Sequence, residues 1–212
     1  MKIRDVLALA PVIPVLTVEK VEHAAPLARA LVAGGLKVLE ITLRTPVALE
    51  AIEIMRVAVP DAIVGAGTLV KSDDFRRAEG VGAQFAVTPG FTPYLAESAA
   101  RVRYPLLPGI VTPGEILQAL HFGFDTLKFF PAQQAGGVPM LQAFGGPFAN
   151  VAFCPTGGIS RESAPSFLKL RNVLCVGGSW VAPAALVEKG DWAGIEALAR
   201  DAAGLARQAV SS

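Results

Sequence analysis

Short hydrophobic runs recur along the chain, and each is followed by turn-forming residues and a longer, alanine-rich amphipathic segment. Successive runs start 20 to 26 residues apart, which is the length of one strand, one helix and two short loops. The pattern therefore predicts alternating strands and helices. The strand candidates begin near Val12, Val38, Ile63, Gln84, Leu106, Thr126, Val151 and Val173.

Helices are predicted between these runs, over residues 19–34, 46–59, 72–80 and 114–122 among others. Thr45 and Thr112 each precede a proline, which predicts a capping side chain followed by proline in the first helical position. The sequence SDD at residues 72–74 predicts another helix start, and paired glycines at 34–35 predict a helix end. A short helix is expected before the first strand.

The repeated unit predicts an α/β fold, a TIM (β/α)8 barrel, as a single domain over residues 1–212. An open, doubly wound sheet is the alternative, but it has fewer strands at this length, and no GxGxxG follows the first run. No linker or low-complexity segment divides the chain. In a barrel, chemistry lies at the carboxyl ends of the strands, so each motif is judged by its place on a strand.

Composition narrows the classes of partner. The chain is 52% hydrophobic and 17% charged, which is typical of a sheet buried on both faces. Its formal net charge of +1, without a basic tract, argues against nucleic acid or an anionic membrane as a partner. Asp5 and two prolines interrupt the N-terminal apolar run, so we expect a helix and a strand there, no membrane span, and a cytoplasmic protein.

The cysteines and histidines do not have the spacing of a metal site. Cys154 and Cys175 lie in apolar runs and are predicted to be buried thiols, while His23 and His121 are far apart in the sequence. We therefore expect neither a metal nor a cofactor.

A lysine interrupts the apolar run LKFFPA at residues 127–132. If Lys128 points into the barrel, desolvation disfavours its ammonium form, and a neutral amine is a nucleophile toward carbonyl carbons. The alternatives are a lysine paired with a carboxylate inside the barrel and one that faces solvent.

Glu40 is equally out of place, within the second run, KVLEITLR. Inward side chains of barrel strands meet, so Glu40 and Lys128 are predicted to form either a structural ion pair or an acid–base pair. By the period of two, Glu40 shares a strand face with Thr42 and Arg44. Arg44 lies at the rim, where a guanidinium can bind a carboxylate or phosphate, or is an ordinary surface arginine.

Paired glycines follow the seventh and eighth runs, at residues 157–158 and 177–178. We expect each pair to lead into a helix, the first at Ser160, and the amides there to bind a phosphate. Two ordinary glycine turns are the alternative. Thr68 ends the third run, and its hydroxyl is expected to contact a ligand.

Six motifs together resemble the 2-keto-3-deoxy-6-phosphogluconate (KDPG) aldolase family, which overlaps with 4-hydroxy-2-oxoglutarate aldolase. The resemblance implies a class I, metal-independent aldolase on a (β/α)8 barrel, usually a homotrimer, acting on a small keto-acid phosphate. The motifs are EITLRT (40–45), GAGT (65–68), FAVTPG (85–90), LKFFPA (127–132), FCPTGGIS (153–160) and VGGSW (176–180).

The resemblance also implies roles for single residues. The Schiff-base lysine matches Lys128, and the acid–base glutamate matches Glu40. Arg44 and Thr68 match the groups that bind the substrate carboxylate. The phosphate-binding backbone matches Gly157, Gly158, Gly178 and Ser179, and the pocket lining matches Pro89, Phe130 and Thr156. Thr17 stands where some members carry an arginine after the first strand.

Two other classes stay open on the residues alone. A phosphate-binding barrel isomerase or decarboxylase would use Lys128 and Glu40 for proton transfer and form no covalent adduct. A non-catalytic sensor would bind sugar phosphates with the lysine merely ion-paired.

Overall fold

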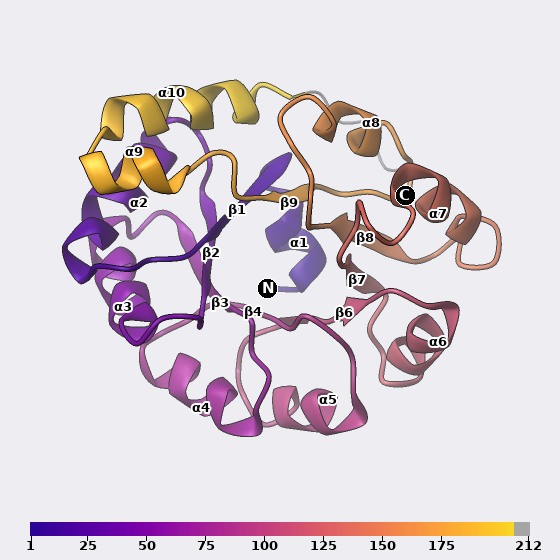
Figure 1. Cartoon of the computed structure of the whole chain (residues 1–212). Coiled ribbons are helices and arrows are strands. Elements are labelled where there is room, and N and C mark those ends of the chain that lie inside the picture. The colour runs from indigo at the N-terminus through magenta and orange to yellow at the C-terminus, as the bar shows by residue number, and fades with distance from the viewer. Residues whose placement is uncertain (206–212) are drawn as a thin grey trace.

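The described residues, 1–205, form a closed barrel of parallel strands inside a ring of helices in the computed structural model (Figure 1). This confirms the predicted TIM-type α/β fold. The predicted single domain extends to residue 212, and residues 206–212 lie outside the described part.

The strands pair in parallel throughout, in the order β5-β4-β3-β2-β1-β9 and β6-β7-β8. Bridges between Phe153 and Val173 and between Thr156 and Gly177 join β8 to β9 and complete the ring on that side. The strands are β1 (Val12–Leu16), β2 (Val38–Thr42), β3 (Ile63–Gly67), β4 (Ala86–Val87), β5 (Leu106–Leu107), β6 (Gly109–Ile110), β7 (Thr126–Phe129), β8 (Ala152–Pro155) and β9 (Val176–Gly178).

The predicted fifth strand is divided into β5 and β6 at Pro108. Proline has no N–H and cannot donate to the ladder. Its carbonyl still accepts a hydrogen bond of 2.8 Å from the amide of Lys128, so β7 stays attached there. The eighth predicted strand also begins later, at Val176 rather than Val173, which takes part only in an isolated bridge.

Helices cover the outside of the barrel, and α10, the last helix, packs beside α2 (Figure 1). The predicted second helix is a short η1 turn followed by α2. The helices are α1 (Ile3–Leu7), η1 (Val21–His23), α2 (Ala24–Ala33), α3 (Ala48–Ala58), α4 (Ser72–Gly80), α5 (Pro93–Ala99), α6 (Pro113–His121), α7 (Gly137–Phe144), α8 (Ala164–Leu168), α9 (Ala184–Lys189) and α10 (Trp192–Ala203).

One of the two predicted threonine caps is confirmed and the other is wrong. Thr112 accepts from the amide of Glu115, whose carboxylate accepts in return from the Thr112 amide. Thr45 instead donates 2.6 Å to the carbonyl of Val18, and α3 begins later, after Val47. Thr45 is therefore used to attach the β2–α3 loop to the end of β1, a contact that a local capping rule does not contain.

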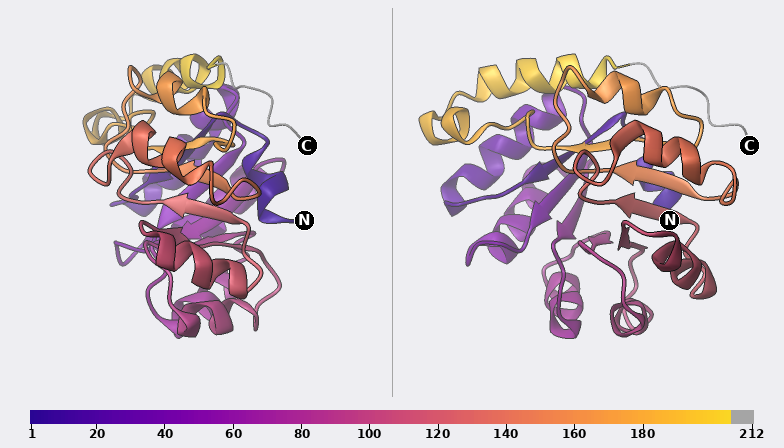
Figure 2. Two further views of the ribbon diagram at one scale, coloured as in Figure 1. Left: turned by 90° about the vertical axis from the view of Figure 1, so that its right-hand side faces the viewer. Right: turned by 45° about the vertical axis from the view of Figure 1, so that its right-hand side comes forward.

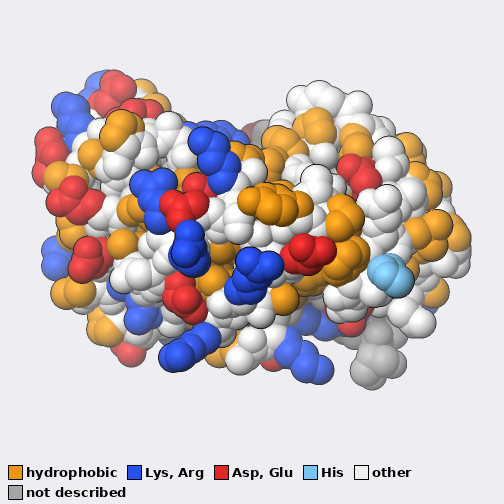
Figure 3. All heavy atoms as spheres, turned by 90° about the horizontal axis from the view of Figure 1, so that it is seen from below, with side chains coloured by type: hydrophobic (Ala, Val, Ile, Leu, Met, Phe, Trp, Pro, Cys, Tyr) orange, Lys and Arg blue, Asp and Glu red, His pale blue; other side chains and the backbone are white. Residues whose placement is uncertain are grey.

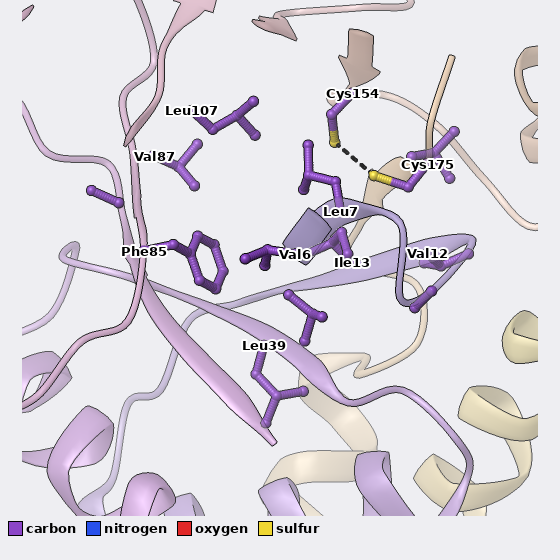
Figure 4. Close-up of a cluster of buried hydrophobic side chains, with 14 of the residues drawn as sticks. Val6, Leu7, Val12, Ile13, Leu39, Phe85, Val87, Leu107, Cys154 and Cys175 are labelled. Atoms are coloured by element: carbon purple, nitrogen blue, oxygen red, sulfur yellow. Dashed lines mark hydrogen bonds between the residues drawn. The ribbon is translucent and has the colours of Figure 1, made fainter. Parts of the chain in front are cut away.

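The short first helix covers one end of the barrel, as Figure 2 shows. Its Val6 and Leu7 are fully buried and group with Ile13 and Phe85 in a cluster of apolar side chains (Figure 4). The cluster fills the end of the barrel opposite the carboxyl ends of the strands. Chemistry is thereby confined to the other end.

Both cysteines are buried at the edge of this cluster, as predicted, with their sulfur atoms 3.5 Å apart (Figure 4). Among the described residues, no helix is both long and apolar enough to cross a membrane.

Candidate active site

The two out-of-place charges lie side by side inside the barrel. Lys128 Nζ is 3.4 Å from Glu40 Oε1, although the residues are far apart in the sequence and lie on β7 and β2. Their side chains are only 6% and 4% exposed, respectively. Burying such a pair carries a desolvation cost, and removing one partner would leave the other as an uncompensated buried charge. Each group therefore stabilises the other. The amine also lies 5.2 Å from the centre of the Phe130 ring.

Space for the Glu40 carboxylate comes from a glycine on the neighbouring strand. In the register of β2 and β3, Thr42 lies opposite Gly67. A Cβ at Gly67 would come within 2.7 Å of Glu40 Cγ and closer still to its Oε1. No real Cβ is found so close to another heavy atom, so only glycine admits the acid in this position. Sequence reasoning did not assign a role to Gly67, which was visible only as part of the GAGT motif.

Lys128 is held by strands on both sides, opposite Gly109 of β6 and Cys154 of β8. Gly109 also permits a close approach, because a Cβ there would lie 2.6 Å from the carbonyl oxygens of Thr88 and Pro89. Its amide donates 3.2 Å to the Thr88 hydroxyl. Through these contacts the segment of Thr88 and Pro89 packs closely against β6, the strand next to that of Lys128.

A cavity of about 270 Å³ opens above the lysine at the carboxyl ends of the strands, and we refer to it as the lysine cavity. It contains the basic side chains of Arg44 and Lys128 and no carboxylate, so it suits an anionic ligand. Most of the predicted site residues meet here. Its lining is Val15, Thr17, Arg44, Lys128, Phe130, Thr156, Gly157, Gly158, Ile159, Gly177, Gly178 and Ser179.

Three predicted site residues lie outside that lining: Glu40 on β2, Thr68 directly after β3, and Pro89, two residues after the end of β4. Thr68 has a φ of +63°, a left-handed conformation that is unfavourable for a β-branched residue. Strained backbone of this kind persists where surrounding structure imposes it, often at binding sites.

Arg44 extends from the turn beyond β2 rather than from the strand itself, because β2 ends at Thr42. It is exposed, and within the described part of the chain no carboxylate lies in ion-pair distance of it. Its guanidinium is available to an anion in the lysine cavity.

The glycine turns form the other wall, but not as helix starts. The predicted helix at Ser160 is wrong: α8 begins at Ala164 and has five residues. The amide of Ser160 donates to the Ser163 hydroxyl, and the amide of Ser163 donates to the Ser160 hydroxyl, so these serines form a local turn instead. After β9, α9 likewise begins only at Ala184.

The conformation of the first turn does require glycine. Gly157 and Gly158 have φ values of +103° and +71°, which L side chains rarely adopt. A Cβ at Gly157 would lie 3.3 Å from the Phe130 ring, so this turn packs directly on the residue that follows the lysine strand. Exposed amides in such turns can bind an anion without a helix dipole.

Within residues 1–205, no group of three or more His, Cys, Asp or Glu side chains is arranged to hold a metal ion. The lysine cavity is lined by an amine, a guanidinium and hydroxyls, and the carboxylate of Glu40 lies next to it, in contact with Lys128. The arrangement is suited to attack on a carbonyl carbon by the amine, with a carboxylate beside it to move protons.

Comparison with known proteins identifies close relatives of the whole chain. Residues 3–198 match the family described as "Aldolase: KDPG and KHG aldolase". The 2-dehydro-3-deoxy-phosphogluconate aldolase of Dickeya dadantii is 50% identical over 198 residues, which is 93% of each chain.

Solved structures agree. The KDPG aldolase of Zymomonas mobilis ZM4 with 3-phosphoglycerate is 49% identical, with a TM-score of 0.94, covering 99% of this chain and 98% of that one. The enzyme of Legionella pneumophila, solved with pyruvate captured as a covalent carbinolamine intermediate, is 43% identical, with a TM-score of 0.93 and coverage of 95% and 98%.

Proposed function

Because this chain belongs to the KDPG and KHG aldolase family, we propose that it is a class I aldolase whose Lys128 forms a Schiff base with the substrate. The chain is an aldolase, a carbon–carbon lyase, that cleaves 2-keto-3-deoxy-6-phosphogluconate into pyruvate and glyceraldehyde 3-phosphate. The family description includes 4-hydroxy-2-oxoglutarate (KHG) as a second substrate. The finer mechanism is built from the residues around Lys128.

The first step is formation of the iminium. Neutral Lys128 attacks the C2 carbonyl carbon, and loss of water leaves a C=N⁺ bond that can accept electrons. The position of Lys128 supports this step, because its side chain lines the lysine cavity, where a ligand carbonyl can approach the amine. The positive iminium supplies the electron sink, so the step requires no metal.

The second step is cleavage. Glu40 accepts the proton of the C4 hydroxyl, the C3–C4 bond breaks, and its electrons move into the iminium to give an enamine. Glyceraldehyde 3-phosphate leaves. Glu40 then returns the proton to C3, and water hydrolyses the new iminium to release pyruvate and the free amine. The distance of 3.4 Å between Glu40 Oε1 and Lys128 Nζ supports one carboxylate serving both transfers.

Substrate binding uses the two walls of the site. Arg44 and Thr68 hold the keto-acid carboxylate on the side of β2 and β3. Phosphate lies against the amides of the glycine turns at Gly157–Gly158 and at Gly178, with the Ser179 hydroxyl beside it. Pro89, Phe130 and Thr156 shape the space between these two ends.

The Lys128–Glu40 contact carries the proposal, and borohydride trapping tests it. Incubation with pyruvate, chelator and sodium borohydride should give a stable adduct whose modified peptide contains Lys128. Lys128→Ala should give none, while Lys71→Ala, which removes an exposed lysine, should be trapped like the wild type. A folded wild-type protein that forms no adduct would refute the Schiff-base mechanism.

Binding and trapping together separate the two alternatives. If the protein is a sensor, the Lys128→Ala variant should bind the sugar-acid phosphate as tightly as the wild type does. If it is a proton-transfer isomerase, the wild type should bind the ligand and form no covalent adduct. The carbinolamine in the Legionella pneumophila structure favours the covalent route for its relative.

We also propose that the chain forms a homotrimer. Leu117, Leu120 and Phe122 are large apolar side chains exposed on and just after α6, and apolar side chains gather on that side of the molecule in Figure 3. A groove of about 360 Å³ between α5 and Phe122 adjoins them. An exposed face of this kind favours burial against another copy.

Light scattering after gel filtration tests the assembly. Leu117→Glu combined with Leu120→Glu should yield monomers, whereas Val57→Glu, on the 80% exposed Val57 of α3, should leave the trimer intact. A monomeric wild type at working concentration would refute the trimer.

A further inference from the structure

A second cavity, of about 500 Å³, opens beside the lysine cavity, and we refer to it as the outer cavity. The two cavities share three lining residues: Val15, Thr17 and Ser179. They are therefore adjacent chambers at the ends of β1 and β9. Of the residues proposed to bind the keto-acid carboxylate and the phosphate, Ser179 alone also lines the outer cavity, so the rest of that cavity has no part in the function described above.

The hydroxyl of Thr17 has a fixed direction at this shared wall. Thr42 donates its hydroxyl proton to the carbonyl of Leu16 at 2.9 Å. In the 3.1 Å contact between Thr17 and Thr42, Thr17 must consequently be the donor. As long as it donates to Thr42, Thr17 can only accept a hydrogen bond from a ligand. An ionised phosphate oxygen has no proton to give it, whereas a sugar hydroxyl does.

Ser179 complements Thr17 from the other strand. Within the described residues, its hydroxyl makes no hydrogen bond, so it is free to donate to a ligand. A ligand hydroxyl both donates and accepts, and the pair of Thr17 and Ser179 offers it one partner of each kind.

Charge also distinguishes the two chambers. The lysine cavity is lined by the basic side chains of Arg44 and Lys128 and by no carboxylate. The outer cavity is lined by two carboxylates, Glu19 and Glu188, and one ammonium, Lys20, beside the imidazole of His23. A phosphate dianion is attracted to the first chamber and gains nothing in the second.

The wall of the outer cavity formed by α9 and the residues just before it is apolar. It consists of Ala182, Pro183, Ala184 and Val187, at the start and along one side of α9. His23, on the facing side, packs edge-on against Trp192 with ring centres 5.7 Å apart. Apolar walls with a few directed polar groups are typical of sites for small organic ligands.

We propose that the outer cavity is a second acceptor subsite, which binds the tail of neutral polyhydroxy aldehydes during aldol addition to pyruvate. The proposal rests on the proposed function, because the pyruvate enamine must first form on Lys128. The enamine carbon then attacks the aldehyde carbon, a C–C bond forms, and the aldehyde oxygen takes the proton held by Glu40. Thr17 and Ser179 bind hydroxyls of the tail, which extends toward α9 rather than toward the glycine turns.

The test compares two aldehydes in the addition reaction with pyruvate: unphosphorylated D-erythrose and D-glyceraldehyde 3-phosphate. Ala184→Phe fills the outer cavity and should lower kcat/KM for erythrose roughly fivefold to tenfold, the scale of one lost packing or hydrogen-bond contact. The same substitution should change kcat/KM for the phosphorylated aldehyde by no more than about twofold. Ala185→Phe, on the adjacent exposed residue outside the lining, should change neither value.

Thr17→Val tests the hydroxyl separately, since it removes the acceptor with little change of shape. It should lower kcat/KM for erythrose about fivefold and shift the ratio of the two aldehydes in favour of the phosphorylated one. Equal losses for both aldehydes, or unchanged use of erythrose in both Thr17→Val and Ala184→Phe, would overturn the proposal.

Borohydride trapping of pyruvate on each variant separates the two hypotheses. If wild-type protein forms no adduct, the proposed function fails. If all variants form the adduct and the aldehyde ratio does not move, only the second subsite fails.

Discussion

Gly67 is the residue on which the position of the acid depends. Its missing side chain is the space that Glu40 occupies, and Glu40 in turn is the partner of Lys128. The reactive pair is thus set by three residues on three different strands, only two of which carry any chemistry. A family motif contains Gly67, but its physical reason lies in a contact across the sheet.

We predict that Gly67→Ala displaces the Glu40 carboxylate. Stability to urea should fall by about 1–3 kcal/mol, the usual cost of overpacking, and the cleavage rate should fall with it. Gly80→Ala is the matched control, because nothing lies within 4 Å of a Cβ there and the residue is helical. That control should be neutral or slightly stabilising. An active, stable Gly67→Ala protein would contradict this account of Glu40.

We predict that Glu40→Gln separates the chemical steps. The amide keeps the shape of the acid but cannot accept the C4 hydroxyl proton, so the cleavage rate should fall about 10²- to 10⁴-fold. Lys128 remains, so borohydride should still trap pyruvate on it, although more slowly. Rapid-quench cleavage assays and intact mass measure the two effects. Wild-type cleavage by this variant would assign the proton transfer to another group.

At the scale of elements, some helix starts are set by residues close in the sequence and others by contacts with distant residues. The start of α6 depends on neighbours within four residues, since Thr112 and Glu115 bind each other's amides and the Val111 amide also donates to Glu115. The start of α3 depends on Thr45 binding Val18, across to the end of β1. Capping rules predict the first kind and miss the second.

We predict that Thr112→Ala costs about 1 kcal/mol of unfolding free energy, because the first turn of α6 loses its capping hydroxyl. Gln118→Ala, an exposed substitution within the same helix, should cost little or stabilise slightly. Urea unfolding monitored by circular dichroism compares them. Equal stability of Thr112→Ala and the wild type would show that Glu115 alone is a sufficient cap.

At the scale of the whole molecule, side-chain contacts link elements that lie far apart in the sequence. Arg161, in the turn before α8, forms a two-pronged ion pair with Asp201 of α10, one prong of which is 2.9 Å long. This contact links the loop of the glycine turn to the last helix of the described chain. The hydrogen bonds from Arg161 hold the pKa of Asp201 below its usual value.

We predict a matching pH dependence of stability. A carboxyl whose pKa is lower in the folded state stabilises above its unfolded pKa, near 4, and loses that contribution as the pH falls through the folded value. Asp201→Asn should therefore lower the thermal midpoint slightly at pH 7, and this difference should shrink as the pH falls through the folded pKa of Asp201. The effect is small because both side chains are substantially exposed. A difference that persisted unchanged at low pH would exclude the ion pair as its cause.

The sequence by itself determined the fold class, the approximate position of nearly every strand, and the two residues that interrupt buried strands with charge. Those features are local: a hydrophobic period, a cap, or a Lys or Glu in an apolar run is visible within a few residues. Lys128 and Glu40 could be predicted as partners because inward positions of a barrel meet.

Only the tertiary structure decided how those residues are supported. The need for Gly67, the role of Thr45, the turn at Ser160 in place of a helix, and the outer cavity beside Thr17 each depend on contacts between segments far apart in the chain. Such contacts are set by strand register and by the three-dimensional shape of neighbouring side chains. The hydrophobic pattern of a single segment contains neither the strand register nor the shape of its neighbours. These contacts therefore become visible only in the folded barrel.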